Sequence, residues 1–101
     1  MPANYREMER LDSMPVVWIP SLMRSLTNNQ EQVEIFGETL REVVESLESS
    51  FPGIKDRICE DDRIRPGLAV SVDGVVGNEG LRQRVDTNSE IHFVTAISGG
   101  A

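Results

Sequence analysis

The sequence is poor in cysteine, aromatic residues and long apolar runs. Its single cysteine, Cys59, cannot form a disulfide within the chain or a cysteine-built zinc site, so core packing must stabilise the fold. Five aromatic residues provide few platforms for stacking nucleic-acid bases. No apolar stretch reaches the length of a membrane span, and the first residues lack the segments of a secretory signal. We therefore expect a cytoplasmic protein that binds neither membranes nor nucleic acids.

Basic residues are also in the minority. Ten Lys and Arg stand against seventeen Asp and Glu, which gives a net charge of -7 at pH 7. This charge repels nucleic acids and anionic lipids and favours basic protein surfaces as partners. With 101 residues the chain can bury one modest core but not two. Residues 1–14 mix charge, proline and asparagine without an apolar period, so we expect them to form a flexible leader.

Two short strands are expected next. Residues 16–20 (VVWIP) are β-branched or aromatic up to Ile19, and Pro15 and Pro20 fix the limits of this segment. Residues 33–36 follow a polar segment that contains Asn28 and Asn29, two residues that tolerate turn geometry. Two strands joined by a loop of this length predict a loose hairpin.

A capped amphipathic helix is the clearest element. Thr39 and Glu42 have the T-x-x-E spacing of a capping box, in which each side chain satisfies a free backbone amide. Pro52 and Gly53 end the helix. The apolar stripe, which predicts a helix over residues 40–51, consists of Leu40, Val43, Val44, Leu47 and Phe51. The glutamates predicted to face water are Glu38, Glu42, Glu45 and Glu48.

The second half of the chain reads as a short helical turn and a charged loop, followed by strands. Residues 68–72 alternate in polarity, and Asp73-Gly74 is a preferred pair for a tight hairpin turn. Residues 77–89 read as a connecting loop, and residues 90–97 as the last strand. One helix cannot cover both faces of a sheet, so we expect a two-layer α+β domain with one open face.

Few side chains stand out as candidates for chemistry. Cys59 lies among acidic residues that disfavour its thiolate, so we expect a buried or bystander thiol. His92 has no partner at metal-ligand spacing and is expected to face solvent on the open face of the sheet. No metal site is expected. Arg82 and Arg84 are candidates for guiding an acidic partner or for simple solubility.

The order of elements, with a last strand that runs into Gly-Gly, resembles the β-grasp fold of ubiquitin-like proteins. More narrowly, it resembles the MoaD/ThiS family of bacterial and archaeal sulfur carriers. The segments that carry this resemblance are VWIPSLMRSLT, GETLREVVESLESSFPGIKDRI, LAVSVDGV and SEIHFVTAISGG. On this resemblance, residues 15–97 form the β-grasp domain and residues 98–101 form a flexible C-terminal tail.

The resemblance implies a carrier protein, not an enzyme. An adenylating, E1-like activating enzyme would use ATP to join the carboxylate of Gly100 to AMP, so the chain itself would bind no cofactor. Sulfur would then displace AMP, and the resulting thiocarboxylate would supply a biosynthetic enzyme that makes molybdopterin, thiamine, cysteine or a related product. Such carriers work free or as the small subunit of a synthase. The way they dock implies that His92 and Val94 contact the activating enzyme.

The last residues suit a tail that enters a partner's active site. Gly99 and Gly100 let narrow walls approach the backbone, and residues 96–100, which include Ser98, could reach about 17 Å when extended. Ala101 departs from the family pattern because it holds the carbonyl of Gly100 in a peptide bond. The resemblance permits its removal by a metalloprotease, whereas a cloning remnant is the alternative. Two other functions stay open: a protein modifier that joins Gly100 to lysines, and a plain interaction domain with an inert tail.

Overall fold

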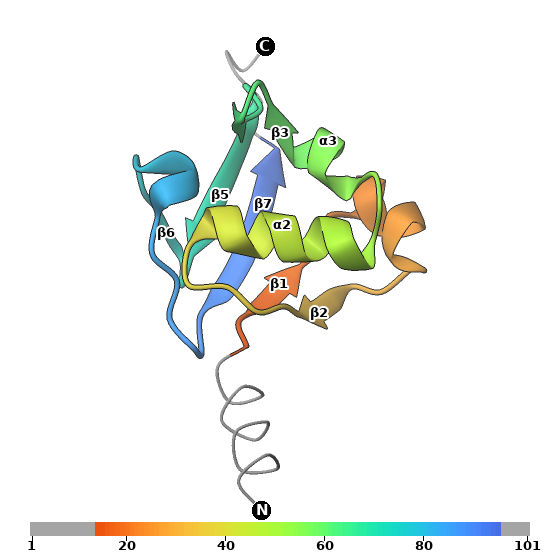
Figure 1. Ribbon diagram of the computed structural model, residues 1–101, viewed down its shortest axis with the longest axis horizontal. Coiled ribbons are helices and arrows are strands. Elements are labelled where there is room, and N and C mark those ends of the chain that lie inside the picture. Colours follow the sequence, from red (N-terminus) through yellow and green to blue (C-terminus); the bar gives the residue numbers. More distant parts are fainter. Residues whose placement is uncertain (1–13, 96–101) are drawn as a thin grey trace, which may run out of the picture.

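A five-stranded sheet with one long helix across it forms the part of the chain that the computed structural model describes, residues 14–95 (Figure 1). The order across the sheet is β2-β1-β7-β5-β6. The central strands β1 and β7 run parallel, and every other neighbouring pair is antiparallel. The strands are β1 (Val16–Trp18), β2 (Gln32–Glu34), β5 (Leu68–Val72), β6 (Val75–Val76) and β7 (Glu90–Thr95). The expected two-layer α+β architecture is confirmed.

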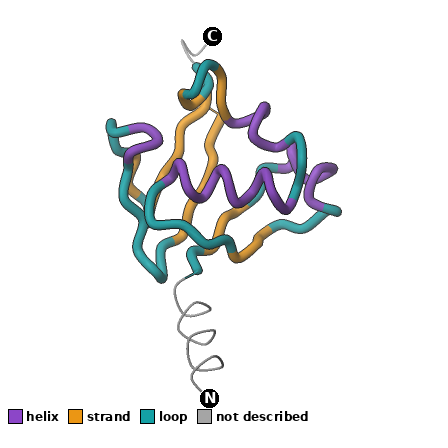
Figure 2. The backbone as a smooth tube through the Cα atoms, viewed as in Figure 1, coloured by secondary structure: helices purple, strands orange, loops and turns teal. Residues whose placement is uncertain are grey.

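Helices and a small two-stranded hairpin outside the main sheet connect these strands (Figure 2). The main helix, α2 (Leu40–Ser50), lies across one face of the sheet, and the short α3 (Ile54–Ile58) follows it. Two 3-10 helices, η1 (Ser21–Thr27) and η2 (Gly80–Arg82), stand where loops were predicted. The hairpin of β3 (Cys59–Glu60) and β4 (Arg63–Ile64) replaces the predicted charged loop.

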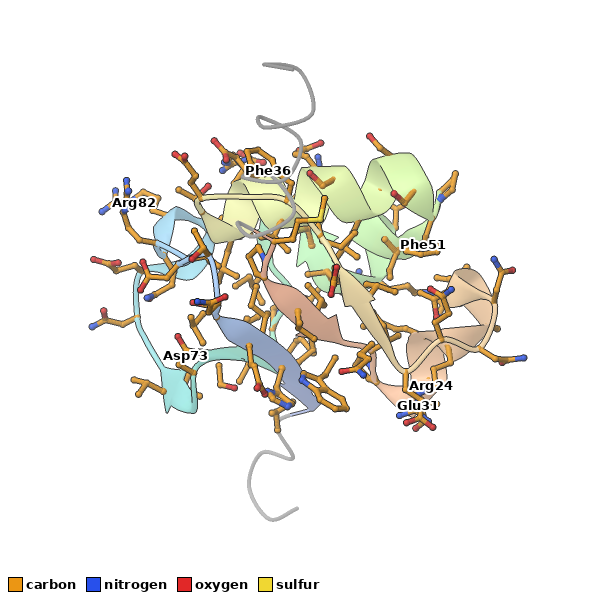
Figure 3. All side chains as sticks on the ribbon, turned by 90° about the horizontal axis from the view of Figure 1, so that it is seen from below. Arg24, Glu31, Phe36, Phe51, Asp73 and Arg82 are labelled. Carbon is orange, nitrogen blue, oxygen red and sulfur yellow. The ribbon has the colours of Figure 1, made fainter. Side chains whose placement is uncertain are left out.

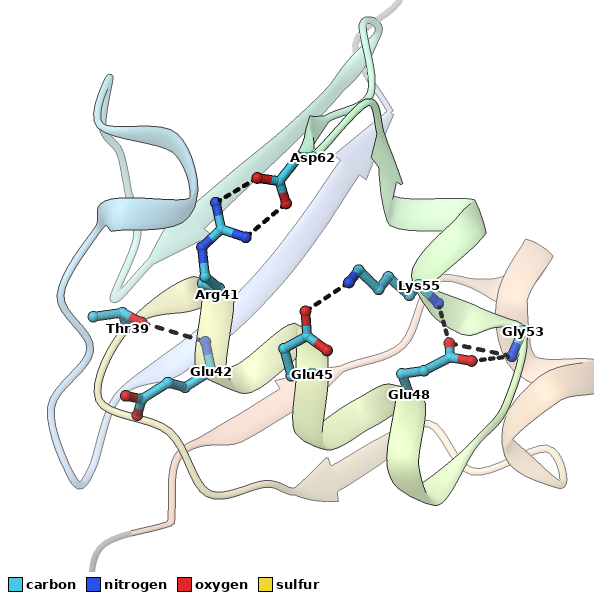
Figure 4. Close-up of polar contacts among 8 residues, drawn as sticks. All are labelled: Thr39, Arg41, Glu42, Glu45, Glu48, Gly53, Lys55 and Asp62. Carbon is cyan, nitrogen blue, oxygen red and sulfur yellow. Dashed lines mark hydrogen bonds and ion pairs between the residues drawn. The ribbon is translucent and has the colours of Figure 1, made fainter.

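The N-terminus of α2 is capped much as the sequence predicts. The hydroxyl of Thr39 accepts the N–H of Glu42 at 3.3 Å (Figure 4). The Glu42 carboxylate accepts a backbone N–H in return. That return bond, of 2.9 Å, goes to Glu38 rather than to Thr39. Both side chains therefore satisfy orphan amides at the start of the helix, as expected, but with one donor shifted by a residue.

The C-terminus of α2 differs from the prediction at Glu48. This carboxylate does not simply face water: it accepts the backbone N–H groups of Gly53 and Lys55 (Figure 4). The N–H of Lys55, followed by that of Gly53, holds the pKa of Glu48 below its ordinary value. Gly53 has a left-handed backbone with φ 101°, as its predicted role in ending the helix requires. Glu48 thus fixes the sharp turn from α2 into α3.

The core lies between the sheet and the helices. Val17 and Ile91, opposite each other on β1 and β7, are fully buried beneath α2. Val43 and Leu47 from α2, with Ile54 from α3, are equally inaccessible. Burying a side chain of this size stabilises the fold by about 1.5–3 kcal/mol. The apolar stripe of α2 therefore packs where the sequence predicts, except that Phe51 at its end is only partly buried.

The first hairpin is confirmed, with shifted limits. β1 pairs antiparallel with β2, but β2 begins one residue earlier and ends two residues earlier than the predicted strand. Between them, η1 buries Met23 and Thr27, and the Thr27 hydroxyl donates to the carbonyls of Arg24 and Gln30. The predicted turn then follows at Asn28 and Asn29, whose φ values are 56° and 64°. Buried side chains and the hydrogen bonds of Thr27 thus order the polar segment.

Candidate functional site

The central strand β7 leads directly to the predicted tail. It ends at Thr95, and Ser98, Gly99, Gly100 and Ala101 lie outside the described residues. Strand β7 lies between β1 and β5, and at its end Thr95 pairs with Leu68, the first residue of β5. Strand β1 pairs only with residues 90–92 of β7, so β5 alone holds the last residues of β7 before the predicted tail.

An apolar patch covers the face of the sheet opposite α2. Its residues, called the open-face patch below, are Trp18, Ala69, Val76, His92 and Val94, contributed by four strands. Trp18 pairs with His92 across β1 and β7, and Ala69 pairs with Val94 across β5 and β7. Because successive side chains of a strand alternate between faces, these residues share the face away from Ile91 and Phe93. Val94 is 49% exposed and Val76 is 59% exposed.

The rings of Trp18 and His92 stack at the centre of this patch. Their centroids are 5.5 Å apart and their planes differ by 7°. His92 therefore lies on the open face, as predicted, but it is half-buried against Trp18 instead of freely facing solvent. The indole N–H of Trp18 is buried and has no hydrogen-bond partner within residues 14–95. The stack holds both rings in a defined orientation within the patch.

Sequence reasoning found His92 and Val94 but missed Trp18. The alternation of β7 is a local signal, so it places both β7 residues on the open face. Trp18 joins them only because β1 pairs with β7, from the other end of the chain, in the register Trp18 to His92. Neither strand carries a signal for that pairing; a match to a fold with a known strand order could have supplied it.

Cys59 is a buried free thiol, as expected, although the main physical cause differs. Burial is the main factor that raises the pKa of its thiol above the ordinary value, and the acids Asp62 and Glu45 add smaller contributions. The cations of Lys55 and Arg41 oppose this shift. The thiol is therefore kept protonated chiefly by its apolar surroundings and not by its acidic neighbours, and it offers no nucleophile at the surface.

The charged side chains around α2 join structural elements. Arg41 makes a two-pronged contact with Asp62, at 2.6 and 3.2 Å, which ties α2 to the β3–β4 hairpin (Figure 4). Lys55 donates to Glu45 at 2.6 Å and ties α3 to α2. Arg82 and Arg84 are exposed, and whether they guide a partner stays a prediction. No cluster of three or more His, Cys, Asp or Glu that could hold a metal occurs within residues 14–95.

No helix in the described part of the chain is long and apolar enough to cross a membrane.

The fold is that of a β-grasp protein of the ubiquitin-like class. It consists of the β1–β2 hairpin, a helix packed across the sheet, the β5–β6 hairpin and a final strand, β7, parallel to β1. The sequence comparison is more specific. A family model described as "ThiS family" matches residues 17–100, so the chain belongs to the ThiS family. The match covers the main sheet apart from Val16, the first residue of β1, and extends to Gly100.

Relatives with solved structures share this architecture. The sulfur carrier protein CysO of Mycobacterium tuberculosis is 29% identical over 91 residues, which cover 83% of this chain and 96% of the relative. A chain of the BexX/CysO complex of Amycolatopsis orientalis superposes with a TM-score of 0.79 at 27% identity, over 85% of this chain and 99% of that one. The small archaeal modifier protein 1 of Methanosarcina acetivorans gives a TM-score of 0.72 at 21% identity, over 87% and 97%, and shows the fold alone.

Proposed function

We propose that this chain is a sulfur carrier whose Gly100 is converted to a thiocarboxylate. The observation that carries the proposal is the ThiS family match, which follows β7 into residues 96–100 and ends on the second glycine. The CysO relatives, named as sulfur carriers, align over 96% of their own length, so the likeness extends along nearly the whole relative. In this role the chain is a substrate of partner enzymes and supplies only the reacting carbonyl.

The chemistry requires an activated carboxylate. A free carboxylate is a poor electrophile because its negative charge opposes nucleophilic attack. An activating enzyme therefore joins it to AMP from ATP, with release of pyrophosphate. Sulfide then attacks the acyl carbon, the bond to AMP breaks, and a thiocarboxylate and AMP result. Two glycines at the reacting end let the walls of an active site approach the backbone closely, since neither has a Cβ.

Mass spectrometry tests this function directly. A chain that ends at Gly100 is incubated with its activating enzyme, ATP and sulfide. We expect a species in which one oxygen is replaced by sulfur, and we expect it only when ATP is present. Deleting Gly100 provides the control and should abolish the product. Formation of lysine adducts without any sulfur-containing species would identify a protein modifier, and an unreactive chain would identify a plain interaction domain.

The open-face patch is the proposed docking surface for the activating enzyme. It presents exposed apolar side chains around the Trp18–His92 stack, and two of its residues, His92 and Val94, belong to the strand that leads to the tail. An apolar centre with an aromatic anchor is typical of the residues that dominate binding energy at interfaces. Docking here would place the activating enzyme beside the base of the tail, within reach of Gly100.

Val94→Glu should weaken docking without unfolding the protein. A carboxylate in the centre of a dry interface would be desolvated without a partner, so we expect kcat/KM for thiocarboxylate formation to fall at least about tenfold. Val75→Glu is a matched control: Val75 is 66% exposed and pairs with Val72, on the other face of the sheet. The control adds the same charge and should retain normal kinetics. Equal kinetics for both variants would exclude the open-face patch as the docking surface.

The relatives support a choice among the recipient pathways and a role for other partners. The CysO relatives favour cysteine synthesis among the recipient pathways that the sequence leaves open, with a biosynthetic enzyme as the sulfur acceptor. The BexX/CysO complex shows that a CysO protein associates with a second protein, which supports a partner-dependent role for this chain. We also propose that a metalloprotease removes Ala101 before activation, because Gly100 has no free carboxylate to react with ATP while Ala101 follows it.

A further inference from the structure

Strand β2 forms an outer edge of the sheet, and half of its backbone groups point away from the protein. Only β1 lies beside it, with Val33 opposite Val17. The backbone N–H of Ile19 donates to the backbone carbonyl of Glu31 at 2.8 Å, and the N–H of Ile35 donates to the carbonyl of Pro15 at 2.9 Å. The backbone polar groups of Glu31, Val33 and Ile35 therefore point toward β1. Since this direction alternates along an antiparallel strand, Gln32 and Glu34 turn theirs outward.

A shallow groove follows this edge. Its lining comes from β2 and its flanking residues on one side and from the C-terminal end of α2, Ser50 and Phe51, on the other. Val33 and Phe51 are partly buried and provide its apolar surface. Figure 3 faces this edge of the molecule and labels Phe51 and Glu31. An unpaired strand edge beside a groove that offers some apolar surface is the geometry that accepts an added strand.

The electrostatics of the groove favour a cation. Glu31 and Glu34 line it, neither takes part in an ion pair within residues 14–95, and none of the described lining residues is basic. The last turn of α2 also lacks a basic residue, so the negative end of the helix dipole adds to the acidic potential. Pairing β2 of one chain with β2 of a second would bring four carboxylates to one seam. Like charges therefore oppose self-pairing and select a basic partner.

We propose that the β2 edge accepts an extended segment of a partner protein in which basic and apolar residues alternate. The outward N–H and C=O groups of Gln32 and Glu34 would hydrogen-bond its backbone. Its apolar side chains would lie against Val33 and Phe51, on the helix side, and its basic side chains would lie beside Glu34, on the open side. This site adjoins the open-face patch, because Gln32 pairs with Trp18, but it uses the outer edge of β2 and the groove on the helix side. The interaction does not depend on sulfur transfer.

The test uses a short capped peptide of alternating lysine and valine and the isotope-labelled full chain. The largest amide shifts should occur at Gln32, Glu34 and Phe51. Glu34→Pro removes an outward N–H that the fold does not use, and proline is tolerated at such edge positions. Glu34→Ala is its control, because it removes the same carboxylate and keeps the N–H. We expect the proline variant to bind at least about fivefold more weakly than the alanine variant.

A second probe does not depend on how the variant folds. The same peptide, N-methylated on alternate residues, cannot pair with an edge strand and should bind the unmodified chain at least about fivefold more weakly. Equal affinity for both peptides, equal affinity of the two variants, or shifts centred on the open-face patch would overturn the proposal, since charge alone would then explain binding. A β2-dependent dimer of the chain formed without peptide would overturn it as well, because the occupant would be a second copy.

Discussion

A chain that keeps Ala101 is expected to yield no thiocarboxylate, whereas the same chain ending at Gly100 is expected to be converted completely. The expectation has a chemical reason, which concerns Gly100, and a steric reason, which concerns Ala101. With Ala101 in place, the acyl carbon of Gly100 belongs to a peptide bond, and no carboxylate oxygen is available to attack ATP. Only the carboxylate of Ala101 could be adenylated, and its methyl group must then fit a channel that is proposed to admit glycine.

Intact-mass analysis after incubation with the activating enzyme, ATP and sulfide measures this difference. A chain in which glycine replaces Ala101 is the informative control: its terminus has no side chain but is one residue longer. Thiocarboxylate on this control, but not on the Ala101 chain, would show that the active site rejects the methyl group and not the extra length. Equal conversion of the Ala101 and Gly100 forms would exclude a requirement for trimming.

Elements with local signals could be predicted from the sequence. Helix α2 is specified by its cap at Thr39 and its apolar stripe, which act within a few residues of each other. The β5–β6 hairpin is specified by Asp73 and Gly74, whose φ values of 53° and 85° match the turn that this pair favours. The Asp73 carboxylate also accepts hydrogen bonds from the Ser89 hydroxyl and the Glu90 N–H, which no local pattern indicates.

Elements fixed by distant contacts could not be predicted. The β3–β4 hairpin turns at Asp61 and Asp62, with φ values of 54° and 62°, but without a glycine this pair is a weak turn signal. The segment before β7 is ordered by backbone hydrogen bonds to the start of α2. The N–H of Leu40 donates to the carbonyl of Gln83, and the N–H of Val85 donates to the carbonyl of Glu38. The same limit applies to the open-face patch, because Trp18 joins it only through long-range pairing.

Gly37→Ala is expected to be the most destabilising small substitution in the described body of the protein. Gly37 is buried between β2 and α2, and a Cβ there would lie 2.6 Å from a methyl carbon of Val43 and 2.7 Å from its backbone nitrogen. The backbone nitrogen of Val43 cannot move away easily, because its N–H donates to the backbone carbonyl of Thr39 at 3.0 Å in the first turn of α2. We expect the free energy of unfolding to fall by about 2–3 kcal/mol, measured by urea denaturation.

Gly77→Ala is the matched control for this effect. A Cβ at Gly77 would also be too close to another atom, at 2.4 Å, but that atom is the side-chain oxygen of Gln83, at the end of a flexible chain. Gln83 can rotate away, so we expect a loss below about 0.5 kcal/mol. Equal losses would contradict the argument. Below the urea concentration at which it unfolds, the Gly37→Ala variant should still form the thiocarboxylate. Gly37 serves only the close approach of the chain to α2, whereas Gly99 and Gly100 are proposed to let the tail enter the active site of an enzyme.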